Sequence, residues 1–98
     1  MAEFIKINPA DNVAVAINDV EAGVGFDIDG VSITTLTKIP AGHKVALKAL
    51  AEGEDVVKYG FPIGHLLQAV PQGGLIDHSV LKTNLEGLLE YTYQPDLD

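Results

Sequence analysis

Two adjacent residues, His43 and Lys44, carry the side chains of this sequence that are best suited to acid–base chemistry. Histidine titrates near neutral pH and can act as a general base or acid, whereas a lysine ammonium group can bind a substrate carboxylate. The preceding turn, residues 39–42, can hold one side chain at the surface while the other turns inward or lies along the next strand. We expect the turn to present both groups to a reaction pocket. A surface histidine and lysine without a function is the alternative.

A second candidate pair, Lys58 and Tyr59, stands directly before Gly60. A tyrosine hydroxyl can donate a hydrogen bond to a developing oxyanion, and a lysine can neutralise its charge. We therefore predict that this pair binds substrate. The end of an amphipathic strand, with the tyrosine half in the core, explains the same residues without a function.

Asp11 and Asn12 offer side-chain oxygens that could bind a hard cation or position substrate hydroxyl groups, and Asn12 is our third substrate-binding candidate. A turn between two strands accounts for both residues without a function and is the interpretation that we favour, because Asp and Asn favour turns. His65 and His78 are isolated in sequence and form no short metal-binding motif, so we interpret them as structural hydrogen-bond partners and predict no metal ligand in this chain.

Four short runs share one pattern, in which an apolar residue, two turn-tolerant residues, a glycine and two variable residues precede another apolar residue. The runs are residues 20–26, 39–45, 50–56 and 70–76, and proline occupies the second position in two of them. Proline fixes φ and glycine accepts a positive φ, so each run predicts a tight turn between two short strands. The spacing of the glycines is too irregular for a solenoid.

The remaining pattern predicts an all-β domain of short bent hairpins with little helix. Asp29-Gly30 between alternating segments is typical of a hairpin turn. The expected strands are residues 4–7, 13–17, 26–29, 31–35, 43–50, 55–59 and 75–81. We expect a turn at 8–12, a loop at 60–64 and a helical turn at 84–93.

Composition narrows the possible functions. The 98 residues suffice for one domain, the net charge is −8, and arginine and cysteine are absent. An acidic chain without arginine is unsuited to nucleic-acid binding, which needs a basic surface. The absence of cysteine excludes disulfides and thiolate metal sites in this chain. No apolar segment approaches the roughly 20 residues that span a bilayer, and no signal peptide is recognisable, so we expect a cytoplasmic protein without a membrane partner.

Several of these segments, in the same order, resemble the SAF domain of the altronate and galactarate dehydratases. The matching segments are residues 11–14, 39–47, 53–60, 63–64, 82–85 and 91–95. The resemblance implies a β-clip fold for residues 1–82, followed at 83–98 by an extension or linker toward a large catalytic domain or subunit. Altronate-type members carry a His-x-His-Asn run whose histidines fall on Asp77 and Ser79 here. On a strand these two positions share a face that His78 does not, so a two-histidine metal contact is in doubt.

The resemblance also implies a function: a small subunit or N-terminal domain of a sugar-acid dehydratase that is inactive alone. The complete enzyme would contain a divalent metal ion (iron, manganese or magnesium), would eliminate water from a hexonate or hexarate, and could form a homo-oligomer. His43 and Lys44 would then be catalytic. Two alternatives stay open: a non-catalytic module that docks to a larger protein or binds carbohydrate, and the small subunit of a sulfolactate sulfo-lyase.

Overall fold

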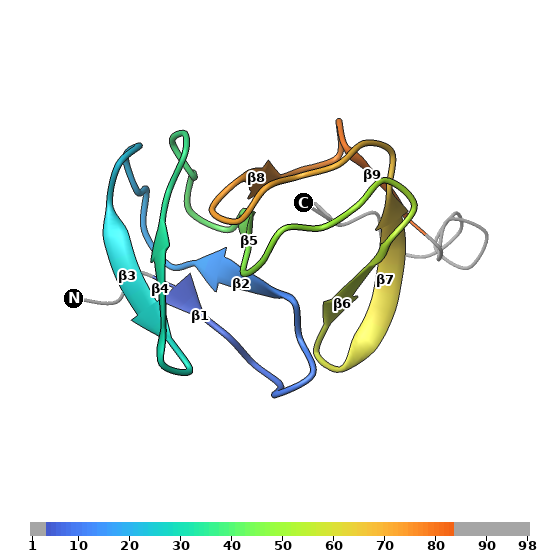
Figure 1. Cartoon of the computed structure of the whole chain (residues 1–98), viewed down its shortest axis with the longest axis horizontal. Helices are drawn as coiled ribbons and strands as arrows, with labels where there is room; N and C mark the ends of the chain where they lie inside the picture. The colour runs from blue at the N-terminus through green and yellow to red at the C-terminus, as the bar shows by residue number, and fades with distance from the viewer. Residues whose placement is uncertain (1–3, 84–98) are drawn as a thin grey trace.

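The computed structural model describes residues 4–83, which form nine short strands arranged in three antiparallel sheets (Figure 1). The strands are β1 (Phe4–Ile5), β2 (Val13–Ala16), β3 (Gly25–Ile28), β4 (Val31–Thr34), β5 (Lys44–Ala46), β6 (Asp55–Lys58), β7 (Phe61–Leu66), β8 (Leu75–Ile76) and β9 (Leu81–Thr83). This part of the chain contains no helix, and so none that could span a membrane. The predicted all-β class is confirmed.

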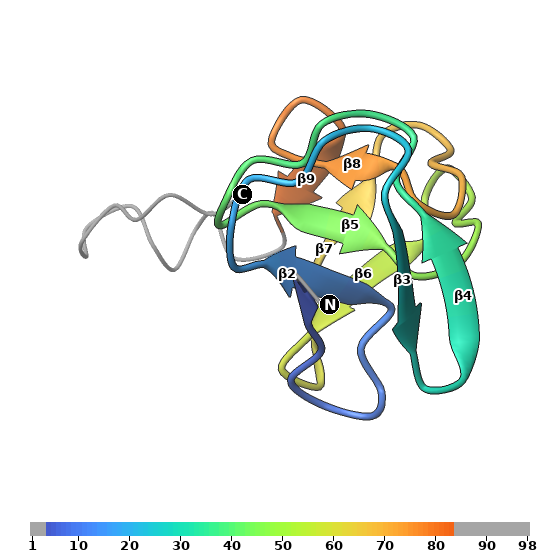
Figure 2. The same ribbon diagram turned by 90° about the vertical axis from the view of Figure 1, so that its left-hand side faces the viewer.

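A central sheet in the order β1-β2-β5-β8 separates two hydrophobic cores. Because successive side chains on a strand point to opposite faces, Val45 joins one core and Ala46 joins the other. The β3–β4 hairpin covers the first core with Phe26, whose ring centroid lies 4.3 Å from that of Phe4. The sheet β6-β7-β9 covers the second core with Val56. Figures 1 and 2 show these two units on opposite sides of the central strands.

The four predicted glycine turns are present, with φ between 83° and 86° at Gly23, Gly42, Gly53 and Gly73. Three of them close with a backbone hydrogen bond across four residues; in the second turn the His43 N–H donates to the Pro40 carbonyl at 3.0 Å. Proline is therefore the first residue of the closed turn, not the second as the pattern suggested.

The first glycine turn closes through a side chain. The buried hydroxyl of Thr35 accepts from the Val24 N–H at 2.9 Å and donates to the Glu21 carbonyl at 2.7 Å. It thus takes the place of the direct backbone bond.

Both hairpins turn through two residues of positive φ, which is the geometry that matches the twist of paired strands. Asp29 and Gly30 have φ values of 54° and 80°, as predicted, and Tyr59 and Gly60 have 59° and 79°. The predicted loop at 60–64 is wrong, because these residues after Gly60 belong to β7. The predicted strand at 75–81 is also wrong, since a turn separates β8 from β9. The expected helical turn at 84–93 and the extension at 83–98, beyond Thr83, lie outside the described residues.

The two hairpin units repeat one another in sequence. Each begins at an apolar residue, passes a glycine turn and a hairpin, and returns to pair with its own start: Val20 with Ile39, and Leu50 with Val70. A second glycine turn then leads from each unit into a strand of the central sheet, β5 or β8. Equivalent glycines are separated by a nearly constant number of residues, although neighbouring glycines are not. The domain is thus an internal duplication, which the irregular spacing concealed.

Candidate functional site

His43 is held in place by its backbone at the start of β5. Its N–H donates to the Pro40 carbonyl at 3.0 Å, and its carbonyl accepts from the Ala16 N–H at 2.9 Å. The ring is half-buried, and its Nδ1 lies 3.5 Å from the Ala41 carbonyl oxygen. A rigid turn therefore presents a partly accessible imidazole, as the sequence predicted.

Lys44 is placed differently from our expectation. Its side chain is fully buried, with 0% of its surface exposed. As the first residue of β5, it faces Val15 on β2 and Ile76 on β8, in the interior of the central sheet. The expectation that the turn would present the ammonium group outward is wrong, because strand alternation and the neighbouring strands enclose it.

Asp77, which directly follows β8, is a second ionisable residue on the same side of the fold as His43. Lys44 and Ile76 face each other on antiparallel strands, so His43, which precedes Lys44, and Asp77, which follows Ile76, lie at the same end of the pair. Sequence reasoning did not choose Asp77 as a site residue. The cross-strand register that brings it to His43 could not be read from the sequence, although its alignment with a family histidine was a usable signal.

Asp77 has a lowered pKa because its carboxylate accepts two hydrogen bonds from Ser79. Its Oδ1 accepts from the Ser79 hydroxyl at 2.6 Å and from the Ser79 N–H at 3.0 Å. The hydroxyl bond is the largest cause that lowers the pKa of Asp77 below its ordinary value of 3.8, and the charges of His78 and His43 lower it further. Residues 77–80 form a turn, closed by the Val80 N–H on the Asp77 carbonyl at 3.1 Å. The strand alternation that we assumed for Asp77, His78 and Ser79 therefore does not apply.

Lys58 and Tyr59 form a separate group at the tip of the β6–β7 hairpin. The Lys58 Nζ lies 5.0 Å from the centroid of the Tyr59 ring, a cation–π contact. The hairpin is bonded through Val57 to Asn12, which directly precedes β2. The His43 carbonyl is bonded to Ala16, the last residue of β2. The structure therefore does not bring the two predicted pairs together.

Asn12 fastens β6 to the central sheet. Its side-chain oxygen accepts from the Val57 N–H at 2.8 Å, and its side-chain nitrogen donates to the Asp55 carbonyl at 2.9 Å. These two bonds give Asn12 a structural role. A substrate contact of Asn12 stays a prediction.

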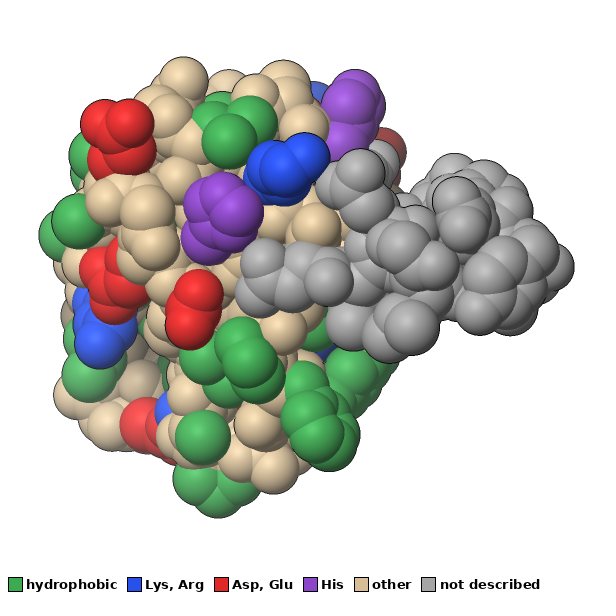
Figure 3. All heavy atoms as spheres, turned by 90° about the vertical axis from the view of Figure 1, so that its right-hand side faces the viewer, with side chains coloured by type: hydrophobic (Ala, Val, Ile, Leu, Met, Phe, Trp, Pro, Cys, Tyr) green, Lys and Arg blue, Asp and Glu red, His purple; other side chains and the backbone are tan. Residues whose placement is uncertain are grey.

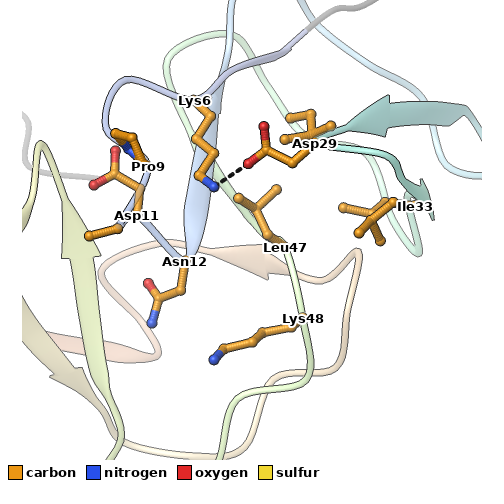
Figure 4. Close-up of a pocket in the computed structure, with 11 residues that line it drawn as sticks. Lys6, Pro9, Asp11, Asn12, Asp29, Ile33, Leu47 and Lys48 are labelled. Atoms are coloured by element: carbon orange, nitrogen blue, oxygen red, sulfur yellow. Dashed lines mark hydrogen bonds and ion pairs between the residues drawn. The ribbon is translucent and has the colours of Figure 1, made fainter.

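Asn12 also borders a shallow groove of about 320 Å³ between the β3–β4 hairpin and residues 47–48 (Figure 4). On one side Lys6 points toward Asp29, with which it forms an ion pair. Lys48 lies on another side. The groove lacks a histidine, and Lys6 is already paired with Asp29.

The remaining histidines do not complete a metal centre. His65 faces Asp55 on β6 and Lys82 on β9, and His78 is exposed in the turn after β8. Within residues 4–83, no group of three or more His, Cys, Asp or Glu side chains is placed to hold a metal ion.

Comparison with known proteins places these elements in a family. Residues 2–84 match the model of the altronate/galactarate dehydratase SAF domain. The chain belongs to this family. It is 43% identical over 98 residues to altronate dehydratase of Bacillus subtilis (strain 168), a match that covers 100% of this chain and 20% of that protein. It is 39% identical over 82 residues to galactarate dehydratase (L-threo-forming) of Escherichia coli (strain K12), covering 82% of the chain and 15% of that protein.

The chain covers a much larger share of another, shorter relative. The SAF domain is 34% identical over 88 residues to (2R)-sulfolactate sulfo-lyase subunit alpha of Chromohalobacter salexigens, covering 83% of the chain and 94% of that protein. The chain thus spans about a fifth of the altronate dehydratases that it matches, but nearly the whole of this subunit. The same domain therefore occurs within a large enzyme and as a small subunit.

The two copies of the duplicated unit differ at the position of His43 and Lys44. In the internal duplication, His43 and Lys44 correspond to Gly74 and Leu75, which directly follow the equivalent turn. The polar pair is thus not needed to build the turn or the strand after it. This difference favours a functional reading of His43.

Proposed function

We propose that this chain is the small SAF part of a sugar-acid dehydratase and supplies His43 to a site that a larger catalytic part completes. The observation that carries the proposal is the position of His43: a half-buried imidazole on a rigid turn, beside the ionised carboxylate of Asp77. Its relatives within altronate and galactarate dehydratases support the reaction class.

The chemistry asked of His43 is proton transfer. Dehydration of a hexonate or hexarate breaks the C–H bond next to the carboxylate and the C–O bond of the neighbouring hydroxyl, so that a C=C bond forms and water leaves. The imidazole takes the proton from carbon or gives one to the departing hydroxyl. Asp77, whose pKa is lowered, lies at the same end of the β5–β8 pair as His43.

Lys44 is given no substrate contact, because its side chain is fully buried. The described residues also do not form a complete metal site. We expect a divalent ion (iron, manganese or magnesium) in the complete enzyme, at the site that the larger part completes. Such an ion would supply a Lewis acid for the leaving hydroxyl.

Substitution of His43 by Gln in the complete enzyme tests the proposal. We expect kcat to fall about 10²- to 10⁴-fold, the usual range for a lost general acid or base, with unchanged assembly. His65→Gln is the matched control and should retain turnover. Weaker assembly with normal turnover at saturation would instead identify a docking role for His43. The isolated 98-residue chain should have no dehydratase activity, and turnover by it alone would contradict a shared site.

A second candidate function follows from the sulfolactate sulfo-lyase relatives, of which the chain covers 94% and 90%. In that case the departing group is sulfite rather than water, and the chain would be a separate small subunit. Incubating the complete enzyme with (2R)-sulfolactate and measuring free sulfite distinguishes the two. Sulfite release without dehydration of hexonates or hexarates would favour the sulfo-lyase.

A further inference from the structure

The tip of the β6–β7 hairpin exposes adjoining aromatic side chains. Phe61 is 70% exposed, more than any other large apolar residue described, and Tyr59 is 52% exposed. Figure 3 shows apolar side chains gathered in the lower part of the face that carries β6, β7 and β9, where this hairpin turns in Figure 1. Single exposed apolar residues are ordinary on a protein surface, but a cluster of them marks an interaction site.

The duplicated β3–β4 hairpin provides an internal comparison for the turn. Tyr59 corresponds to Asp29, which also has a positive φ but carries a charge and pairs with Lys6. Phe61 corresponds to Val31, which is smaller and 45% exposed. The turn geometry itself therefore does not require aromatic residues.

The outward face of the β3–β4 hairpin is also more polar than that of the β6–β7 hairpin. On β3–β4 the outward cross-strand pair is Asp27 with Ser32, whose hydroxyl donates to the carboxylate at 2.7 Å. The corresponding pair on β6–β7 is Val57 with Pro62, and both are apolar. The outward face of β3–β4 is thus polar and suited to solvent, whereas the outward face of β6–β7 is apolar.

The apolar tip is also held rigidly before any partner binds. The Asp11 carboxylate accepts from the Gly60 N–H at 2.8 Å, and Asn12 bonds to the backbone of β6 on both sides of Val56. A surface that is already ordered loses little conformational entropy on association. Such a tip is suited to act as an anchor.

We propose that the tip and outer face of the β6–β7 hairpin (Val57, Tyr59, Phe61 and Pro62) dock this domain onto the larger catalytic part of a dehydratase. The proposal rests on the function proposed above. The chain spans 20% of the altronate dehydratase of Bacillus subtilis, so most of that polypeptide lies outside the domain and is available to cover this surface. Aromatic residues at the centre of a contact supply much of its binding energy.

The hairpin also indicates what the receiving surface contains. Lys58 lies over the Tyr59 ring at the tip, in a chain whose net charge is −8. We expect an apolar pocket for Phe61, with an acidic group placed to meet Lys58. A second copy of this acidic domain is a poorer occupant, because the two tips would bring their lysines together.

Photo-cross-linking from position 61 tests the docking. Phe61 is replaced by p-benzoylphenylalanine in the complete enzyme, with the larger part fused or co-purified, and cross-linked peptides are identified by mass spectrometry. We expect peptides of the larger part. The same replacement of Val31, the equivalent residue of the other hairpin, is the control and should not cross-link to it. Cross-links to a second copy of this domain, or none from position 61, would overturn the proposal.

A pair of serine variants gives an independent measurement. Phe61→Ser should leave the thermal midpoint of the 98-residue chain within about 2 °C, because the ring is mostly in solvent. In the complete enzyme it should weaken attachment of the domain about 30-fold or more, as expected for an aromatic anchor, whereas Val31→Ser should not. Equal attachment of both variants would contradict the docking.

The two proposals fail separately. If His43→Gln retains full turnover while position 61 cross-links to the larger part, the catalytic role is wrong and the docking surface stands. If His43→Gln abolishes turnover but position 61 does not cross-link, only the docking surface is wrong.

Discussion

The carboxylate of Asp11 accepts a hydrogen bond from the backbone N–H of Gly60 at 2.8 Å, and so joins the turn before β2 to the tip of the β6–β7 hairpin. Its other oxygen accepts from the Asn8 N–H at 3.0 Å. The residue is 5% exposed. One buried carboxylate therefore holds together two turns that are far apart in sequence, one of which carries the proposed docking surface.

Asp11→Ala should destabilise the chain by about 2 to 3 kcal/mol, because two backbone N–H groups lose a charged acceptor. Urea unfolding at neutral pH measures the loss. Glu52→Ala, an exposed carboxylate in a turn, is the control and should change stability by less than about 0.5 kcal/mol. A small effect on stability together with lost turnover in the complete enzyme would mean that Asp11 binds a ligand after all.

The role of Asp11 and Asn12 shows what the sequence could and could not predict. Their residue types predicted the turn correctly, because turn chemistry is local. Their partners, Gly60 and the backbone of β6, are brought in by the second copy of the duplicated unit. Such long-range pairing leaves no signal in residue types, so these structural bonds of Asp11 and Asn12 could not be predicted from the sequence.

The candidate site, too, could be predicted from the sequence only in its local features. The turn before His43 could be predicted from Pro, Gly and the apolar residues around them. The burial of Lys44 and the approach of Asp77 depend on β5 lying between β2 and β8, and that strand order is a property of the fold. The family resemblance was confirmed because it uses the order of many short segments rather than any one contact.

Ser79→Ala should raise the pKa of Asp77 toward its ordinary value of 3.8, because the Ser79 hydroxyl is the largest cause of its lowering. A carboxylate with a lowered pKa adds stability above its unfolded pKa and loses that contribution as the pH falls through the folded pKa. The wild-type chain should therefore be more stable than the variant at neutral pH by an amount that shrinks as the pH falls below about 4.

A carbon-13 NMR titration of the Asp77 carboxyl carbon in both chains measures this shift. The Asp27 carboxyl carbon, whose hydrogen-bond partner is Ser32, is the control, and its chemical shift at neutral pH should be the same in both chains. An unchanged Asp77 titration in the variant would show that the hydroxyl bond does not set its ionisation.

Lys44→Arg should destabilise the chain by about 1 to 3 kcal/mol, although both side chains are basic. The Lys44 side chain is 0% exposed, and a guanidinium group is wider than an ammonium group and needs a different arrangement of hydrogen-bond acceptors. Lys48→Arg, at an exposed position, should have an effect within about 0.5 kcal/mol. Thermal unfolding of the two variants compares them directly. Equal midpoints would indicate that the surroundings of Lys44 adjust to the larger group.

Two equivalent turn glycines should respond very differently to alanine. Gly42 has a φ of 86° and nothing within 4 Å of an added Cβ, so Gly42→Ala should cost only the conformational strain of about 1 to 2 kcal/mol. Gly73 has a φ of 85°, but its Cβ would lie 2.0 Å from the Thr34 carbonyl oxygen. Backbone bonds from Gly73 to Leu36 and Ala46 prevent an easy shift.

Gly73→Ala should therefore cost at least about 3 kcal/mol, since the clash adds to the strain. Urea unfolding of both variants at one pH measures the difference. Similar losses would mean that the backbone from Thr34 to Leu36 yields to the added methyl group. The close approach at Gly73 joins the β3–β4 unit to the segment entering β8, so the larger loss would show that this contact between the two duplicated units contributes to stability.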